Sequence, residues 1–101
     1  MARQVKWSPE AVEDVESIAQ YISRDSQFYA RATVSKIIDF SHSLAQFPYM
    51  GRMVPEFNDK NIRERLVYSY RLVYKIERAN ILVVAVIHDK RLFHSIPERF
   101  V

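Results

Sequence analysis

The first half of the chain carries two stripes of apolar residues that recur every three or four positions. The first stripe is Val12, Val15, Ile18, Ala19 and Ile22, and the second is Ala30, Val34, Ile37, Ile38, Ser41, Leu44 and Ala45. This spacing places each stripe on one side of an α-helix, where it faces a core. Two amphipathic helices joined by a short break predict an antiparallel helical hairpin.

The ends of both helices can be placed from residue type. Ser8 is a good N-cap, and Pro9 suits the first helical position because its missing N–H would have no partner there. Asp25 or Ser26 can cap the second helix. The helical spacing then continues up to Pro48, which stops the helix.

The period of the pattern changes after residues 48–61, a loop that contains the single glycine of the chain. Strand-like apolar runs follow at Ile62–Val67, Tyr70–Glu77 and Ile81–Ile87, and residues 3–7 also alternate. The run Ile81–Ile87 is apolar on both faces, which is typical of a central strand.

The two links between the last three predicted strands differ in how well their residues suit a tight turn. Residues 78–80 suit a hairpin, with Asn80 able to take the left-handed conformation. Tyr68 and Ser69 are not preferred turn formers. The predicted order is β-α-α-β-β-β. It describes a single α+β domain over residues 1–101, in which an N-terminal strand and the helical hairpin pack on a small antiparallel sheet with one open face.

Composition narrows the class of protein. The 101 residues are 49% hydrophobic and 27% charged and contain no cysteine, so disulfides and thiolate metal sites are excluded. The longest apolar run, Ile81–Ile87, falls short of the roughly 18 residues that span a bilayer. The first seven residues lack the apolar core of a signal peptide. We therefore expect a soluble cytoplasmic protein that does not contact a membrane.

Charge is distributed unevenly between the halves of the chain. Residues 1–49 hold 5 basic and 6 acidic side chains, a net charge of −1, whereas residues 50–101 hold 10 and 6, a net charge of +4. This asymmetry indicates an acidic partner for the second half, either nucleic acid or an acidic protein segment. A charge of +4 is also common in proteins that bind neither.

The ordered pattern of segments resembles the ParE/RelE toxin family from residue 3 to about residue 93. The segments that carry the resemblance are Trp7-Ser8-Pro9-Glu10-Ala11, Phe47-Pro48-Tyr49-Met50-Gly51-Arg52, Arg63-Glu64, Tyr70-Arg71-Leu72-Val73-Tyr74-Lys75-Ile76 and Val86-Ile87-His88-Asp89-Lys90-Arg91. The resemblance implies a cytoplasmic toxin that arrests growth and is neutralised by a cognate, ParD-like antitoxin in a hetero-oligomeric complex. RelE-like members cut messenger RNA on the ribosome, and ParE-like members poison DNA gyrase. Fold alone does not separate the two.

RNA cleavage through a 2′-hydroxyl needs a base, a proton donor and cations around the phosphate. His88 could be the acid or the base because imidazole titrates near neutral pH, and Glu56 or Glu64 could also be the base. The cations that could hold phosphate are Arg65, Arg71, Lys90 and Arg91.

Each candidate also has a structural interpretation. His88 can be a polar residue that emerges at the end of the central strand. Arg71 and Lys75 alternate with core residues and can form an ordinary solvated face. Glu64 can pair with a neighbouring arginine across strands.

The resemblance to the nuclease branch is incomplete. Arg91 falls where RelE-like toxins carry a tail arginine, but Glu64 and Leu66 stand where those toxins tend to have lysine and arginine. No tyrosine follows Arg91 in the tail. Another nuclease subgroup ends in a His-Tyr pair, whereas here Asp89 follows His88. The missing groups favour a toxin that binds gyrase over one that cuts RNA.

In the gyrase interpretation no side chain performs covalent chemistry, and the basic second half faces the target. The residues expected at that contact are Arg52, Arg65, Arg71, Lys90 and Arg91. The alternatives are an mRNA endonuclease that uses His88, Arg91 and Arg65, and a degenerate, non-toxic module that only binds its antitoxin. No cofactor is expected, and no metal site is indicated because the histidines lack ligand spacing.

The chain has more large aromatic side chains than one small core easily absorbs. Those expected to line a groove for the antitoxin are Tyr21, Phe28, Tyr29, Tyr49 and Phe57, with Phe40 as a further member of the set. The alternative is that most of them pack in the core of the hairpin.

Overall fold

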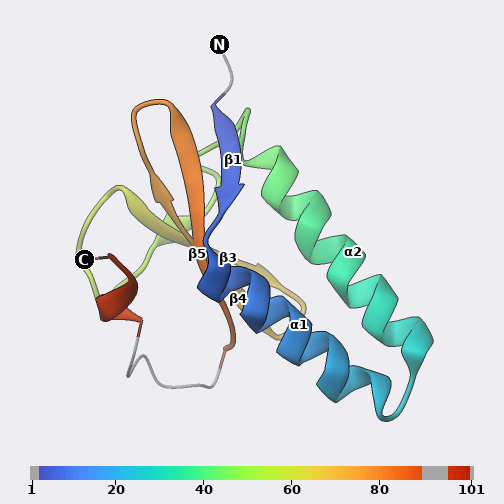
Figure 1. Ribbon diagram of the computed structural model, residues 1–101. Coiled ribbons are helices and arrows are strands. Elements are labelled where there is room, and N and C mark those ends of the chain that lie inside the picture. Colours follow the sequence, from blue (N-terminus) through green and yellow to red (C-terminus); the bar gives the residue numbers. More distant parts are fainter. Residues whose placement is uncertain (1–2, 90–95, 101) are drawn as a thin grey trace.

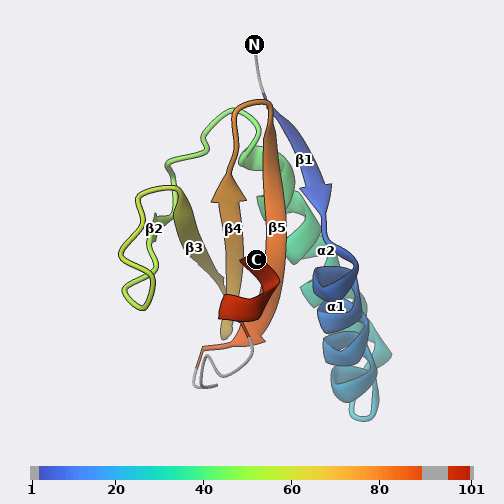
Figure 2. The ribbon, with the colours of Figure 1, turned by 60° about the vertical axis from the view of Figure 1, so that its left-hand side comes forward.

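The computed structural model describes residues 3–89 and 96–100. In chain order its elements are β1 (Gln4–Trp7), α1 (Pro9–Ser23), α2 (Gln27–Ser43), β2 (Arg52–Met53), β3 (Ile62–Val67), β4 (Tyr70–Ile76), β5 (Asn80–His88) and the 3-10 helix η1 (Pro97–Phe100). The two helices form a hairpin beside the sheet (Figure 1). In Figure 2, η1 lies across β4 and β5 on the side away from α2. The predicted α+β class is confirmed, and no helix in the described ranges could span a membrane.

Both helices begin where their capping residues predict. The side-chain oxygen of Ser8 accepts a hydrogen bond from the Ala11 N–H at 3.1 Å, with Pro9 at the first helical position. Ser26, rather than Asp25, caps α2.

The helix α2 ends at Ser43, a few residues earlier than the spacing predicts. Near this end, the hydroxyls of Ser41 and Ser43 bond back to the backbone carbonyls three residues earlier. Such bonds compete with the helical ladder. The chain then tightens into a turn in which the Leu44 N–H donates to the Ser41 carbonyl at 3.2 Å.

The sheet has the strand order β1-β5-β4-β3-β2. The strands β2 to β5 are antiparallel, as predicted, but β1 pairs with β5 in parallel, so the sheet is mixed. The helical hairpin returns the chain to the end of the sheet at which β1 begins, so β3 runs in the same direction as β1. Because β4 is antiparallel to β3 and β5 is antiparallel to β4, β5 is parallel to β1. The two-residue strand β2 was not expected from the sequence.

The turns differ from the sequence prediction. Tyr68, in the two-residue link between β3 and β4, is left-handed, with φ of 55°. Asn80 is not left-handed; it lies within β5 and is paired with Gln4. The prediction for Asn80 is therefore wrong, because β5 begins one residue earlier than its apolar run.

Two cores lie on the two faces of the sheet. The first, under the helices, contains Ala11, Ile37, Leu44, Val67, Leu72, Tyr74, Ile76, Ile81, Val83 and Val86. The second contains Val54, Ile62, Val73, Ala85, Ile87 and Ile96, with Phe57 and Phe100 packed against it. The predicted central strand is confirmed, since β5 contributes to both cores. The face predicted to be open is partly covered by η1 and by the loop between β2 and β3.

Candidate functional site

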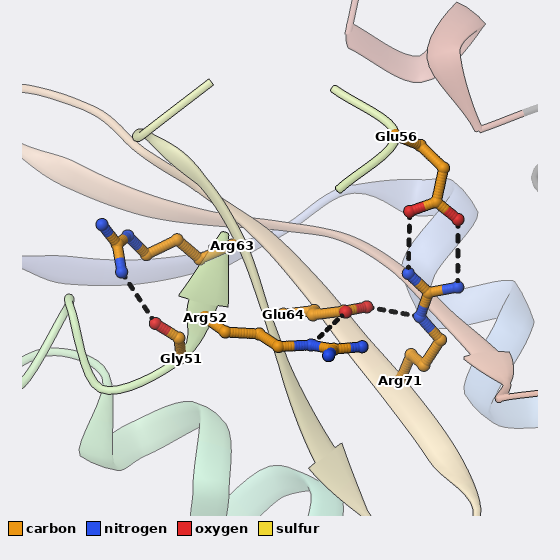
Figure 3. A network of polar contacts seen from close by, with 6 residues as sticks. All are labelled: Gly51, Arg52, Glu56, Arg63, Glu64 and Arg71. Carbon is orange, nitrogen blue, oxygen red and sulfur yellow. Dashed lines mark hydrogen bonds and ion pairs between the residues drawn. The ribbon is translucent and has the colours of Figure 1, made fainter. Parts of the chain in front are cut away.

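A buried carboxylate stands at the centre of the second face. Glu64, on β3, is 1% exposed. Its Oε2 accepts a hydrogen bond from Arg52 Nε at 2.7 Å, and its Oε1 accepts one from Arg71 Nε (Figure 3). Arg52 on β2 is the direct cross-strand partner of Glu64. Arg71 on β4 opposes Leu66, so its side chain reaches Glu64 along the diagonal of the same face.

The guanidinium of Arg71 also holds a second carboxylate. Its Nη2 and Nη1 lie 3.3 and 3.5 Å from the two carboxylate oxygens of Glu56 (Figure 3). Charge-assisted hydrogen bonds are usually about 2.7–2.9 Å, so this contact is the looser one. Burial works to raise the pKa of Glu56, but Arg71 and Arg52 together lower it below its ordinary value. Burial works to lower the pKa of Arg71, but hydrogen bonds to Glu64 and Glu56 raise it. Both shifts favour the ionised forms of Glu56 and Arg71.

A hollow of about 350 Å³ adjoins this network. Its lining residues are Arg52, Pro55, Glu56, Leu66, Arg71 and Asp89. The side chain of Arg71 is 9% exposed, whereas those of Glu56 and Arg52 are 44% and 68% exposed. The charged floor is therefore fixed, and its rim is accessible to solvent.

The loop before β2 is tied to the sheet by Tyr74. Its hydroxyl donates to the Pro48 carbonyl at 2.7 Å and accepts from the Gly51 N–H at 3.0 Å. Arg63 Nη1 donates to the Gly51 carbonyl at 2.9 Å. A Cβ at Gly51 would lie 2.5 Å from the Glu64 carbonyl oxygen, so only glycine fits this approach. These contacts place Arg52 opposite Glu64.

His88 lies at the end of β5 on the other face of the sheet. It pairs across strands with Tyr70, which packs against the first core, and the two ring centroids are 5.7 Å apart. Its Nδ1 is 3.2 Å from Asp89 Oδ1, and its side chain is 48% exposed. This position agrees with a polar residue that emerges from the sheet.

Arg65 also faces the helices, away from Arg71. Its guanidinium lies 4.8 Å from the ring centroid of Phe40, and its buried Nε has no hydrogen-bond partner among the described residues. Arg65 on β3 and His88 on β5 are separated by β4. Two strand spacings amount to about 10 Å. The structure therefore does not bring His88, Arg65 and Arg71 together.

The basic residues proposed from the sequence have different environments. Arg52 is exposed, Arg65 packs on Phe40, and Arg71 is buried in its ion pairs. The interpretation of Arg71 as part of a solvated face is wrong, because its side chain is only 9% exposed and its guanidinium contacts Glu64 and Glu56. The expected pairing of Glu64 with arginine is confirmed. Lys90 and Arg91 lie outside the described residues.

The aromatic candidates fall into separate groups. Tyr21, Phe28 and Tyr29 surround the turn between α1 and α2 and are 64%, 70% and 65% exposed. Tyr49, also exposed, lies beyond the opposite end of α2. The 17 residues of α2 span about 26 Å, so Tyr49 and the three aromatic residues at the turn do not form one patch. Phe57 differs from the other four, because it packs against the second core with its ring centroid 4.9 Å from that of Phe100.

One polar contact was missed by the sequence prediction. Arg99 Nη1 donates to Asp14 Oδ2 at 2.7 Å and to the Val84 carbonyl at 3.0 Å. The same Asp14 oxygen accepts from the Val86 N–H at 2.9 Å. The contact joins α1, β5 and η1 across 85 positions of sequence, and no local pattern signals it.

The sequence model of the family described as "ParE toxin of type II toxin-antitoxin system, parDE" matches residues 5–93. The chain belongs to this family. It is thus a ParE-family toxin of a type II toxin–antitoxin system. No curated protein matches the chain at a significant level.

Solved structures share the fold of this ParE-family toxin at low sequence identity. The chromosomal ParDE system of P. aeruginosa matches with a TM-score of 0.71 and 17% identity, over 86% of this chain and 96% of that one. A mutant of the E. coli toxin RelE in the free state gives 0.72 and 14%, over 100% of both chains. The YoeB dimer from Staphylococcus aureus gives 0.62 and 19%, over 87% and 98%. Toxins with three different names share the fold, so the fold does not select the target.

Proposed function

We propose that this toxin binds DNA gyrase and does not cut messenger RNA. The observation that supports this is the separation of the candidate nuclease groups. General acid–base catalysis needs the base within hydrogen-bond reach of the reacting hydroxyl, with cations at the phosphate. Both carboxylate oxygens of Glu64 already accept hydrogen bonds from guanidinium groups, and the charge of Arg71 is balanced by two carboxylates. His88 lies on the opposite face from Glu64 and Arg71, and Arg65, which shares that face, is two strands away.

The contact with gyrase is proposed to use the basic residues of the second half. Arg52 is the exposed member on the described surface, while Arg71 acts indirectly by holding Glu64 in place. Arg65 contributes from the helix side. Lys90 and Arg91 belong to the proposed contact on the basis of the sequence alone.

The test compares two targets with one preparation of toxin. We expect purified toxin to inhibit supercoiling by gyrase and to accumulate cleaved DNA after protein denaturation, with translation in a cell-free extract unaffected. Arg52→Ala should weaken the inhibition, whereas Arg78→Ala, an exposed arginine in the β4–β5 turn, should not. Unaffected gyrase beside cleaved mRNA would establish the nuclease alternative. Induced expression without growth arrest would establish a non-toxic module.

The exposed aromatic residues at the tip of the helical hairpin are proposed to bind a ParD-like antitoxin. Exposed apolar patches on small domains usually mark partner sites. Phe28 and Tyr29 meet edge to face, with ring centroids 5.5 Å apart, and Tyr21 is exposed beside the same turn. Tyr49 would be a second contact at the far end of α2. Phe57 contributes through the second core rather than through exposed surface.

Affinity measurements on the co-expressed antitoxin test this assignment. Alanine at Phe28 or Tyr29 should weaken binding at least tenfold if either is a central anchor, about 1.4 kcal/mol or more. The matched control is Tyr68→Ala, which removes a tyrosine that is 64% exposed but lies in the β3–β4 turn. Equal effects of the hairpin and control variants would contradict the assignment.

A further inference from the structure

Arg71 holds its two carboxylate partners unequally. Glu64 is 1% exposed, and one of its oxygens accepts from Arg71 Nε. Glu56 is on a loop, its side chain is 44% exposed, and its contacts to Arg71 are 3.3 and 3.5 Å long (Figure 3). Glu64 is therefore a permanent partner, and Glu56 is a partner that can leave without unfolding the sheet.

We propose that the hollow beside Arg71 binds a carboxylate side chain of a protein partner, which takes the place of Glu56. The Nη atoms of Arg71 already present a two-pronged fork to the two carboxylate oxygens of Glu56, the geometry in which arginine binds a carboxylate in a bidentate manner. An incoming carboxylate replaces Glu56 at the fork of Arg71, and the displaced Glu56 side chain, already 44% exposed, turns into solvent. In the free protein the Glu56 carboxylate occupies this position, so the buried guanidinium of Arg71 keeps a charged partner before the ligand binds.

The mixture of cations and carboxylates at the site favours a single carboxylate over the phosphate backbone of a nucleic acid. Among the described residues, the guanidinium groups of Arg52 and Arg71 contact the carboxylates of Glu64 and Glu56, and Asp89 also lines the hollow. Affinity for a phosphate backbone comes from several uncompensated cations along its path. A single carboxylate needs only the fork of Arg71, whereas a run of phosphates would meet the negative charges of Glu64 and Asp89.

The apolar walls of the hollow further restrict which carboxylate ligand fits. Leu66 is 53% exposed and, with Pro55, provides apolar surface beside the charged floor. Leu66 also lies on β3 beyond the end of its pairing with the short β2. The ligand that fits is a glutamate or aspartate flanked by apolar residues in an extended segment. Such a site does not depend on whether the toxin's target is gyrase or the ribosome.

The decisive variant is Glu56→Gln, compared with Glu98→Gln, which removes the same charge from an exposed position on η1. The probe is the capped peptide acetyl-Leu-Glu-Leu-amide, and binding is followed through the NMR signal of Arg71 Nε–H. If Glu56 occupies the fork about nine-tenths of the time, its removal should tighten binding of the peptide roughly tenfold. Glu98→Gln should bind as the unchanged protein does.

Two further probes complete the experiment. The matched peptide acetyl-Leu-Gln-Leu-amide should not bind, and an oligonucleotide of eight thymidines should bind Glu56→Gln more weakly than the glutamate peptide does. Equal peptide affinity in Glu56→Gln and the unchanged protein would overturn the exchange. Tighter binding of the oligonucleotide would overturn the choice of a protein ligand. A thermal unfolding curve of Glu56→Gln confirms that the fold is intact, so a negative result counts against the proposal.

Discussion

The carboxylate of Glu64 lies between the guanidinium groups of Arg52 and Arg71, with each of its oxygens bonded to a different arginine. Glu64 is 1% exposed, so the two arginines replace the water that its charge would otherwise require. The arrangement links β2, β3 and β4 through side chains. It also accounts for the burial of Arg71, a residue that the alternation of β4 alone would place in solvent.

The removal of this charge should destabilise the fold. Breaking a buried ion pair by removing one partner costs roughly 3–5 kcal/mol, because it leaves an uncompensated charge. We expect Glu64→Gln to lower the free energy of unfolding by about 3 kcal/mol, at the low end because Glu56 still contacts Arg71. Urea unfolding measures the loss. The double variant with Arg71→Met should be more stable than Glu64→Gln alone, and a loss below about 1 kcal/mol for the single variant would contradict a buried ion pair.

Gly51 should not tolerate a side chain. A Cβ there would lie 2.5 Å from the Glu64 carbonyl oxygen and 2.6 Å from the Tyr74 hydroxyl. We expect Gly51→Ala to lower stability by about 1–3 kcal/mol, because the loop must move away from the sheet. The neighbouring exposed Met50→Ala serves as the control and should change stability little. Similar melting temperatures for the two variants would mean that the loop adapts freely.

Most elements of the fold follow from local patterns, whereas for the site the sequence predicts the pairing of Glu64 with an arginine but not the burial of Arg71. Ser8 and Pro9 mark the start of α1 because capping depends on adjacent residues. The burial of Ile81–Ile87 on both faces follows from a continuous apolar run. The burial of Arg71, in contrast, depends on the register that sets Arg52 opposite Glu64. That register is fixed by a loop contact with Tyr74, 23 positions from Gly51, and nothing in the sequence near β4 signals it.

Stability at alkaline pH should report on Tyr74. Burial raises its pKa above the ordinary value of about 10, although hydrogen bonding with Gly51 acts in the other direction. Above pH 10 the unfolded chain therefore loses this proton before the folded protein does, so stability falls as pH rises. Tyr74→Phe should make this fall shallower, while Tyr68→Phe, at an exposed tyrosine, should leave it unchanged. Equal slopes for all three proteins would show that ionisation of Tyr74 is not the cause.

At neutral pH Tyr74→Phe should be less stable than the unchanged protein, because the hydrogen bonds of the Tyr74 hydroxyl to Pro48 and Gly51 are lost. Each such hydrogen bond contributes about 0.5–1.5 kcal/mol, so we expect a loss of about 1–3 kcal/mol. Amide exchange at Gly51 should accelerate in Tyr74→Phe, which separates release of the loop from a general loss of stability. Unchanged exchange at Gly51 relative to the β-strands would argue against this anchoring role.

The ion pair between Asp14 and Arg99 should control how firmly η1 is attached. Both side chains are less than one-fifth exposed, and the contact includes a 2.7 Å hydrogen bond. Arg99→Met should release η1, whereas Asp14→Ala should also deprive the Val86 N–H of its acceptor. Hydrogen exchange distinguishes the two variants. Arg99→Met should expose the amide of Arg99, which donates to the Ile96 carbonyl, and leave Val86 protected, while Asp14→Ala should accelerate both. If the Val86 amide stayed protected from exchange in Asp14→Ala, a group other than Asp14 would be its hydrogen-bond acceptor.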